Sequence, residues 1–173
     1  VKAPADPGVL RIERFKIAGK NVTWANLFAV NDRESMIAAA AKLVPYAGEN
    51  TTSVGILNNR SDRQRRALQF ADIAVNDLSF DRLVTFGAYE DLVTNVVTRN
   101  GFPTKHLINL GERRNPTINQ IINETIANMP TNDVLLVGFV NIHTHQAEMM
   151  LEYFEGVAEH DKRRGKKHLV AVA

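Results

Sequence analysis

The sequence predicts an α/β domain with a Rossmann-like, doubly wound and mostly parallel sheet that begins with an antiparallel hairpin. Short apolar segments alternate with longer amphipathic ones between residues 31 and 157, which is the pattern of successive strand–helix units. The run 134–140 is apolar throughout, as expected for a central strand covered on both faces. The segment 10–17 alternates apolar and polar residues, 22–30 is expected to be a second strand, and the glycine-containing turn between them predicts a hairpin.

Further strands are expected at the other short apolar segments, each followed by a helix. These segments are 53–57, 82–86 and 106–109. The closing segment 169–172 follows a basic stretch and fits either an edge strand or a frayed tail.

Helix boundaries follow from capping residues and from apolar spacing. Asn31-Asp32 can cap the first helix, and Ser61 stands three residues before Gln64, the spacing of a capping box. Pro116 occupies the position expected for the first residue of the fourth helix. The third helix should span 89–99 and the last 146–157. The apolar faces expected for the first, second, fourth and last helices are Met36, Ile37, Ala40 and Val44; Ala67, Leu68, Ala71, Ala74, Val75 and Leu78; Ile118, Ile121, Ile122, Ile126 and Met129; and Ala147, Met150, Leu151, Phe154 and Val157.

The length of 173 residues fits one domain, and 45% hydrophobic residues are enough for a core of its own. Residues 1–9 are rich in proline and lack an initiator methionine, so we expect a linker there, the domain at 10–173, and further protein upstream. No cysteine is present, which excludes disulfides and thiolate metal sites. No apolar run reaches the roughly 20 residues that span a bilayer.

The net charge of +2 is too small to indicate nucleic acid, but the arginines are clustered. The cluster consists of Arg60, Arg63, Arg65 and Arg66. It lies between an expected strand and an expected helix start, where free backbone N–H groups also favour anions. Guanidinium groups bind carboxylate or phosphate through paired hydrogen bonds. Because arginines at a helix start oppose the helix dipole, function explains them better than the alternative, a surface ion-pair cluster with Asp62 and Asp72.

Doubly wound sheets bind ligands at the carboxyl ends of their strands, so the loops there form the candidate site. These loops are 31–33, 58–63, 87–90 and 138–145. Within the loop 138–145, His143 fits a contact to substrate or to a neighbouring domain. No metal is expected, because His143 and His145 would not share a helix face and no third ligand is obvious.

Motifs for independent nucleotide activation are missing. Gly19-Lys20 has Arg14 where a phosphate loop needs glycine, and no dinucleotide-binding glycine motif or nucleophile elbow is present. The chain alone is therefore expected to be inactive.

Three sequence blocks carry a family resemblance. The blocks are Asn26 to Ser35; Asn58 to Arg63 with Arg66 and Gln69-Phe70-Ala71; and Gly138, Asn141-Ile142-His143 and Glu152-Tyr153-Phe154. Together they resemble the C-terminal domain of Mur-type ligases. More closely, they resemble the ligase subunit of poly-γ-glutamate synthetase, the CapB/PgsB type of capsule biosynthesis. The chain departs from the Mur pattern where Asp32 replaces a proline and Asn58-Asn59 replace glycines.

The resemblance implies a Mur ligase C-terminal fold within an ATP-dependent amide ligase that joins glutamate units through the γ-carboxylate. An upstream domain would bind ATP and magnesium and form an acyl phosphate, which the amine of an incoming glutamate would attack. The implied partners are that domain, glutamate or poly-γ-glutamate, and small integral-membrane subunits. The implied location is the cytoplasmic face of the cell membrane.

The resemblance and the charge of the loops together select the candidate residues. Candidates for substrate binding are Asn59, Arg60, Asp62, Arg63, Arg66 and His143. Candidates for contact with the nucleotide or a facing domain are Asn31, Asp32 and Arg33. Asp62 would orient Arg63 or Arg66, or bind the incoming ammonium. No general base stands out, so positioning and charge neutralisation should dominate.

A non-catalytic α/β module that binds an anion or docks a partner is the alternative, because it would use the same arginine loop. An ATP-binding domain upstream in the gene would distinguish the two. Nucleic acid ranks last, since aromatic residues are only 7% and do not interleave with the arginines. A homo-oligomer is compatible with the sequence.

Overall fold

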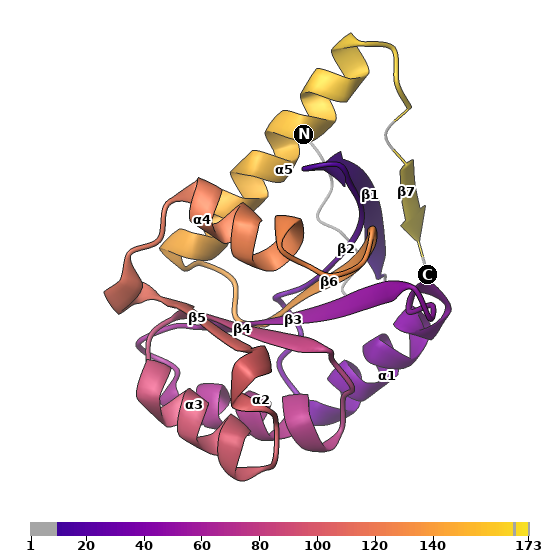
Figure 1. Ribbon diagram of the computed structural model, residues 1–173. Helices are drawn as coiled ribbons and strands as arrows, with labels where there is room; N and C mark the ends of the chain where they lie inside the picture. The colour runs from indigo at the N-terminus through magenta and orange to yellow at the C-terminus, as the bar shows by residue number, and fades with distance from the viewer. Residues whose placement is uncertain (1–9, 168, 173) are drawn as a thin grey trace.

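The fold is a seven-stranded sheet with helices on both faces, as a computed structural model of residues 10–167 and 169–172 shows (Figure 1). The predicted linker, 1–9, lies outside the described residues. The strands are β1 (Arg11–Ile17), β2 (Lys20–Leu27), β3 (Thr51–Asn59), β4 (Arg82–Gly87), β5 (Leu107–Gly111), β6 (Asp133–Val140) and β7 (Leu169–Val172). The α-helices are α1 (Arg33–Leu43), α2 (Gln64–Asn76), α3 (Glu90–Arg99), α4 (Ile118–Ile122) and α5 (His145–Arg163). Shorter 3-10 turns are η1 (Val44–Tyr46), η2 (Thr104–His106) and η3 (Glu112–Arg114), and a π-turn, η4 (Asn123–Ala127), follows α4.

The strand order is β5-β4-β3-β6-β2-β1-β7. The five strands from β5 to β2 are mutually parallel, and β1 pairs antiparallel with both β2 and β7. The register aligns Asn59 with Gly87 and Gly87 with Gly111, so the carboxyl ends of the strands form one edge. This confirms the predicted Rossmann-like sheet with its N-terminal hairpin, and makes 169–172 an edge strand.

Two hydrophobic cores sandwich the sheet. Helices α1 to α3 cover one face and α4 and α5 the other (Figure 1). On the first face Phe139 of β6 stacks on Phe80, with ring centroids 5.7 Å apart. On the second, Trp24 of β2 packs against Phe154 of α5 at 5.2 Å. Burial on both faces holds the strand ends rigidly, which a binding site built on them requires.

Two predicted helix starts were wrong. Ser61 does not cap α2: the chain turns first, with the Arg63 amide bonded to the Arg60 carbonyl, and the helix begins only at Gln64. Pro116 precedes the cap of α4, because Thr117 forms a capping box with Gln120.

One predicted apolar face was wrong, and one predicted helix was too long. In α1, Met36 is buried with Leu43 seven residues on, whereas Ile37 and Val44 are exposed because they fall one position beyond that buried row. The helix expected through 118–129 ends at Ile122 and continues as the π-turn η4.

Candidate functional site

A polar cleft of about 470 Å³ opens at the carboxyl edge of the sheet. Four loops contribute to it, those following β3, β4, β5 and β6. Its lining consists of Asn59, Arg60, Ser61, Asp62, Gly87, Glu112, Asn115, His143, Thr144, His145 and Gln146. The cleft thus brings together four predicted substrate-binding residues, Asn59, Arg60, Asp62 and His143, from segments more than 80 positions apart.

Five predicted residues do not line this cleft. Asp32 caps α1 by accepting the Ser35 amide at 2.8 Å, and this bond lowers the pKa of Asp32. Arg33 reaches from α1 to two carboxylates associated with α2, Asp72 at 2.6 Å and Asp77 at 2.9 Å. The loop with Asn31 is kept away because β2 and β3 are separated by β6.

Arg63 and Arg66 point elsewhere than into the cleft as well. Arg66 donates to the side-chain oxygen of Asn141 at 3.3 Å and so ties α2 to the loop after β6. Arg63 lies 3.8 Å from Asp62 on an exposed surface. The arginine cluster is therefore divided between the cleft, a loop contact and solvent.

Arg60 and Asp62 form a two-point ion pair at the mouth of the cleft. Arg60 donates through Nε and Nη2 to the two oxygens of Asp62, at 3.0 and 2.8 Å. The guanidinium lowers the pKa of the Asp62 carboxyl. Asp62 was expected to orient Arg63 or Arg66. Its closest partner is Arg60, two positions away, whereas Arg63 Nε lies 3.8 Å from its carboxylate and Arg66 bonds Asn141 instead.

Buried amides join β3 to the loop after β6. Asn58 donates to the Asn141 carbonyl at 2.8 Å, and Asn141 donates back to the Asn58 carbonyl at 3.1 Å. Thr144, the N-cap of α5, donates its hydroxyl to Asn58 Oδ1 at 2.5 Å. These bonds fix the N-terminus of α5, whose first residues line the cleft.

The loop after β5 forms a wall of the cleft that the sequence analysis missed. Glu90, whose side chain is only 2% exposed, accepts the Arg113 backbone amide at 2.8 Å and its Nε at 3.2 Å. This anchors η3, which carries Glu112 and is followed by Asn115. The same edge rule, applied to the strand expected at 106–109, would have included this loop.

Metal binding finds no ready cluster in the described part of the chain, where no three His, Asp or Glu side chains are grouped suitably. His143 Nδ1 instead lies 3.5 Å from a carboxylate oxygen of Glu148, both side chains being exposed. The histidine thus packs against the first turn of α5.

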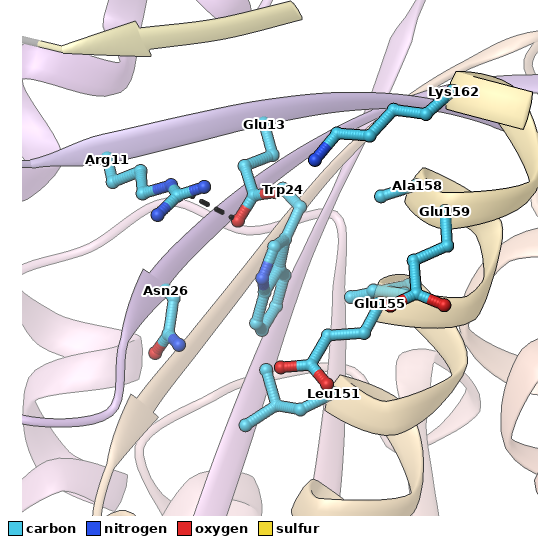
Figure 2. A pocket seen from close by; sticks show the side chains of 10 residues that line it. Arg11, Glu13, Trp24, Asn26, Leu151, Glu155, Ala158, Glu159 and Lys162 are labelled. Atoms are coloured by element: carbon cyan, nitrogen blue, oxygen red, sulfur yellow. Dashed lines mark ion pairs between the residues drawn. The ribbon is translucent and has the colours of Figure 1, made fainter. Parts of the chain in front are cut away.

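A second pocket, of about 450 Å³, lies between α5 and the hairpin (Figure 2). In Figure 2 Arg11 and Glu13 of β1 form an ion pair at 3.5 Å, with Lys162 and the carboxylates of α5 across from them. Trp24 at its base is 2% exposed and belongs to the core. None of the predicted site residues lines this pocket, so the polar cleft is the candidate site.

Comparison with known protein families shows which family the chain belongs to. The model of the poly-gamma-glutamate synthase CapB C-terminal domain matches residues 12–157. The chain belongs to this family. The matched range includes every residue that lines the polar cleft, and the CapB-type resemblance stated from the sequence is thereby confirmed.

Two curated CapB proteins are similar to the chain. It is 28% identical over 110 residues to the capsule biosynthesis protein CapB of Bacillus anthracis, covering 64% of the chain and 24% of that protein. It is 24% identical over 152 residues to the PGA synthase CapB of Bacillus subtilis strain 168, covering 88% of the chain and 37% of that protein. The match to this CapB domain therefore spans well under half the length of either relative. Among the helices of the described residues, none is both long and apolar enough to cross a membrane.

Proposed function

We propose that this CapB domain is the substrate-side domain of an ATP-dependent amide ligase that extends poly-γ-glutamate. Its polar cleft would hold the incoming glutamate. The single observation that carries this proposal is the convergence of Arg60, Asp62 and the α5 N-terminus in one cleft at the carboxyl edge of the sheet.

The cleft offers two kinds of anion binding side by side. Arg60 presents a guanidinium that Asp62 holds in a fixed orientation, so little side-chain entropy is lost when a carboxylate binds. The first residues of the 19-residue helix α5, His145 and Gln146, line the same cleft at the positive end of the helix dipole. A dicarboxylic amino acid suits such an arrangement.

The proposed reaction forms an amide from a γ-carboxylate and an amine. ATP, bound with magnesium mainly by an upstream domain, supplies the phosphoryl group that turns the γ-carboxylate into an acyl phosphate. The nitrogen of the incoming glutamate then bonds to the acyl carbon, the carbon–oxygen bond to phosphate breaks, and the nitrogen loses a proton. The residues of the cleft contribute by orienting the nucleophile and offsetting carboxylate charge.

We also propose that the loop with Asn31, Asp32 and Arg33 contacts the nucleotide or a facing domain, although two of these side chains already have partners within the chain. Asp32 and Arg33 are engaged with Ser35, Asp72 and Asp77. Contact with a facing domain fits this exposed corner better than a complete phosphate site. The further partners we propose are the small integral-membrane subunits, with assembly at the cytoplasmic face of the membrane.

ADP release in the presence of ATP, magnesium and glutamate tests the proposal. The full-length product of the gene and the present chain are assayed in parallel. We expect turnover that depends on glutamate in the full-length protein and none in the chain alone. Glutamate binding to the chain, without glutamate-dependent turnover in the full-length protein together with its membrane subunits, would favour the alternative, a non-catalytic anion-binding module.

A further inference from the structure

The lining of the polar cleft contains a buried acceptor that none of the described residues satisfies. Asn59, the last residue of β3, is 1% exposed and lines the cleft. Its Nδ2 donates to the Leu57 carbonyl at 3.3 Å. Its Oδ1 is the one buried side-chain N or O atom of the described residues without a hydrogen-bond partner. Such atoms are rare because losing the bond to water is costly, so this one calls for a missing donor.

The orientation of the Asn59 amide is fixed by its surroundings. Exchanging its nitrogen and oxygen would set Oδ1 against the Leu57 carbonyl, placing two acceptors face to face. The backbone is held as well, because the Asn59 carbonyl accepts the Ala88 amide at 2.8 Å. Gly87 allows this approach, since a Cβ there would lie 2.0 Å from the Asn59 carbonyl oxygen. A donor for Oδ1 must therefore come from outside the described residues, and the position of Asn59 in the cleft lining allows a ligand to supply it.

The charges around Asn59 favour an amino group as that donor. Arg60 already pairs with Asp62 through Nε and Nη2, and Glu112 adds a second carboxylate to the lining. A carboxylate ligand cannot satisfy Oδ1, because both atoms only accept hydrogen bonds. An amino group donates N–H bonds whether it is charged or neutral, so it can keep this contact while it loses its proton.

Backbone strain around the cleft is independent evidence for a built site. Four residues other than glycine have positive φ at the ends of β4, β5 and β6 or in the loops after them: Tyr89 at +62°, Asn115 at +43°, Val140 at +92° and His143 at +44°. Positive φ is especially unfavourable for the β-branched Val140. Strained conformations of this kind concentrate at binding and catalytic sites. Asn115 and His143 line the cleft themselves.

We propose that Asn59 Oδ1 accepts a hydrogen bond from the amino group of the incoming amino acid, so that the cleft selects an amine-bearing dicarboxylate over a plain one. The inference rests on the proposed function, in which the carboxylate of the same molecule meets Arg60. Asn59 would then be a specificity-determining residue that places the attacking nitrogen.

Binding of glutamate and of glutarate, which lacks the amino group, tests this proposal on the present chain by calorimetry. Loss of one hydrogen bond to a charged group corresponds to a change in Kd of about tenfold or more. We expect glutamate to bind about tenfold more tightly than glutarate, and Asn59→Leu to remove this preference by weakening glutamate alone. Asn95→Leu, on an exposed part of α3, is the matched control and should keep the preference.

The outcomes separate this inference from the proposed function. Equal affinity of the unaltered chain for the two acids would overturn the amine contact and leave carboxylate binding intact. Binding of neither acid would overturn both. Equal weakening of both acids by Asn59→Leu would reduce Asn59 to a structural role. The comparison in the unaltered chain needs no variant, so it decides the matter even if Asn59→Leu does not fold.

Discussion

The wall of the cleft should depend on Glu90 far more than on the acidic residue beside it. Glu90→Ala removes the acceptor of the Arg113 backbone amide, and an unpaired amide costs about 1–3 kcal/mol. A lost buried methylene adds about 0.8 kcal/mol. The loss of an acidic residue from the first turn of α3 adds about 0.3–1 kcal/mol. Removing Glu90 also removes the desolvation cost of its buried carboxylate, which offsets part of these losses. We therefore expect the free energy of unfolding to fall by about 3 kcal/mol.

Asp91→Ala is the matched control for Glu90→Ala. Asp91 occupies the same helical turn and pairs with the same arginine at 2.7 Å, but its side chain is 79% exposed. Its removal should cost less than about 0.5 kcal/mol. Glu90→Gln keeps an acceptor and nearly the same volume, and should fall between the two.

Urea unfolding measures these differences, followed by the fluorescence of Trp24, the chain's single tryptophan and a buried one. If Asp91→Ala cost as much as Glu90→Ala, the exposed ion pair rather than the buried acceptor would anchor the wall. A loss below about 0.5 kcal/mol for Glu90→Ala would refute the reasoning altogether.

Three further predictions concern packing, charge and helix contacts. Gly138→Ala should lower the free energy of unfolding in urea by about 1–3 kcal/mol, because its Cβ would lie 2.5 Å from the Phe28 ring. The control, Gly156→Ala in α5, meets nothing within 4 Å and should raise the free energy of unfolding by about 0.5–1 kcal/mol. Similar effects of the two substitutions would contradict this packing. By NMR, the Asp62 carboxyl should titrate below its ordinary pKa of 3.8, and its pKa should move back toward 3.8 in Arg60→Ala. Because the pKa is lower in the folded state, the stability that this pair contributes is present above pH 3.8 and is lost as pH falls through the lowered value. An unshifted carboxyl would show that the pair does not persist in solution. Arg33→Ala should destabilise the chain by less than about 1 kcal/mol, because its pairs with Asp72 and Asp77 are partly exposed, and a loss above about 2 kcal/mol would mean that they are shielded from water.

The sequence was sufficient to predict the architecture because strand–helix alternation depends on apolar periodicity, which is local. The same local reasoning failed at Ser61, where capping spacing was present but a tight turn and a contact from the Tyr89 hydroxyl to the Ser61 carbonyl hold the segment outside the helix. It also failed at Ile122, where a π-turn interrupts an otherwise regular apolar row.

The candidate site was predicted in part, since Asn59, Arg60, Asp62 and His143 do converge. The wall formed by the loop after β5 depends on contacts between residues that are distant in sequence. The Glu90 to Arg113 anchor that builds the wall with Glu112 has no signal in the order of residues. The same is true of the orphaned oxygen of Asn59, because only packing shows that no donor reaches it.

Chemical-shift mapping of glutamate on the ¹⁵N-labelled chain tests the central claim most directly. If the polar cleft is the glutamate site, the amides of Arg60, Gly87 and Gln146 should shift, and the indole N–H of Trp24 in the second pocket should not. Shifts confined to Trp24 and the facing part of α5, or no shifts at millimolar glutamate, would contradict the account.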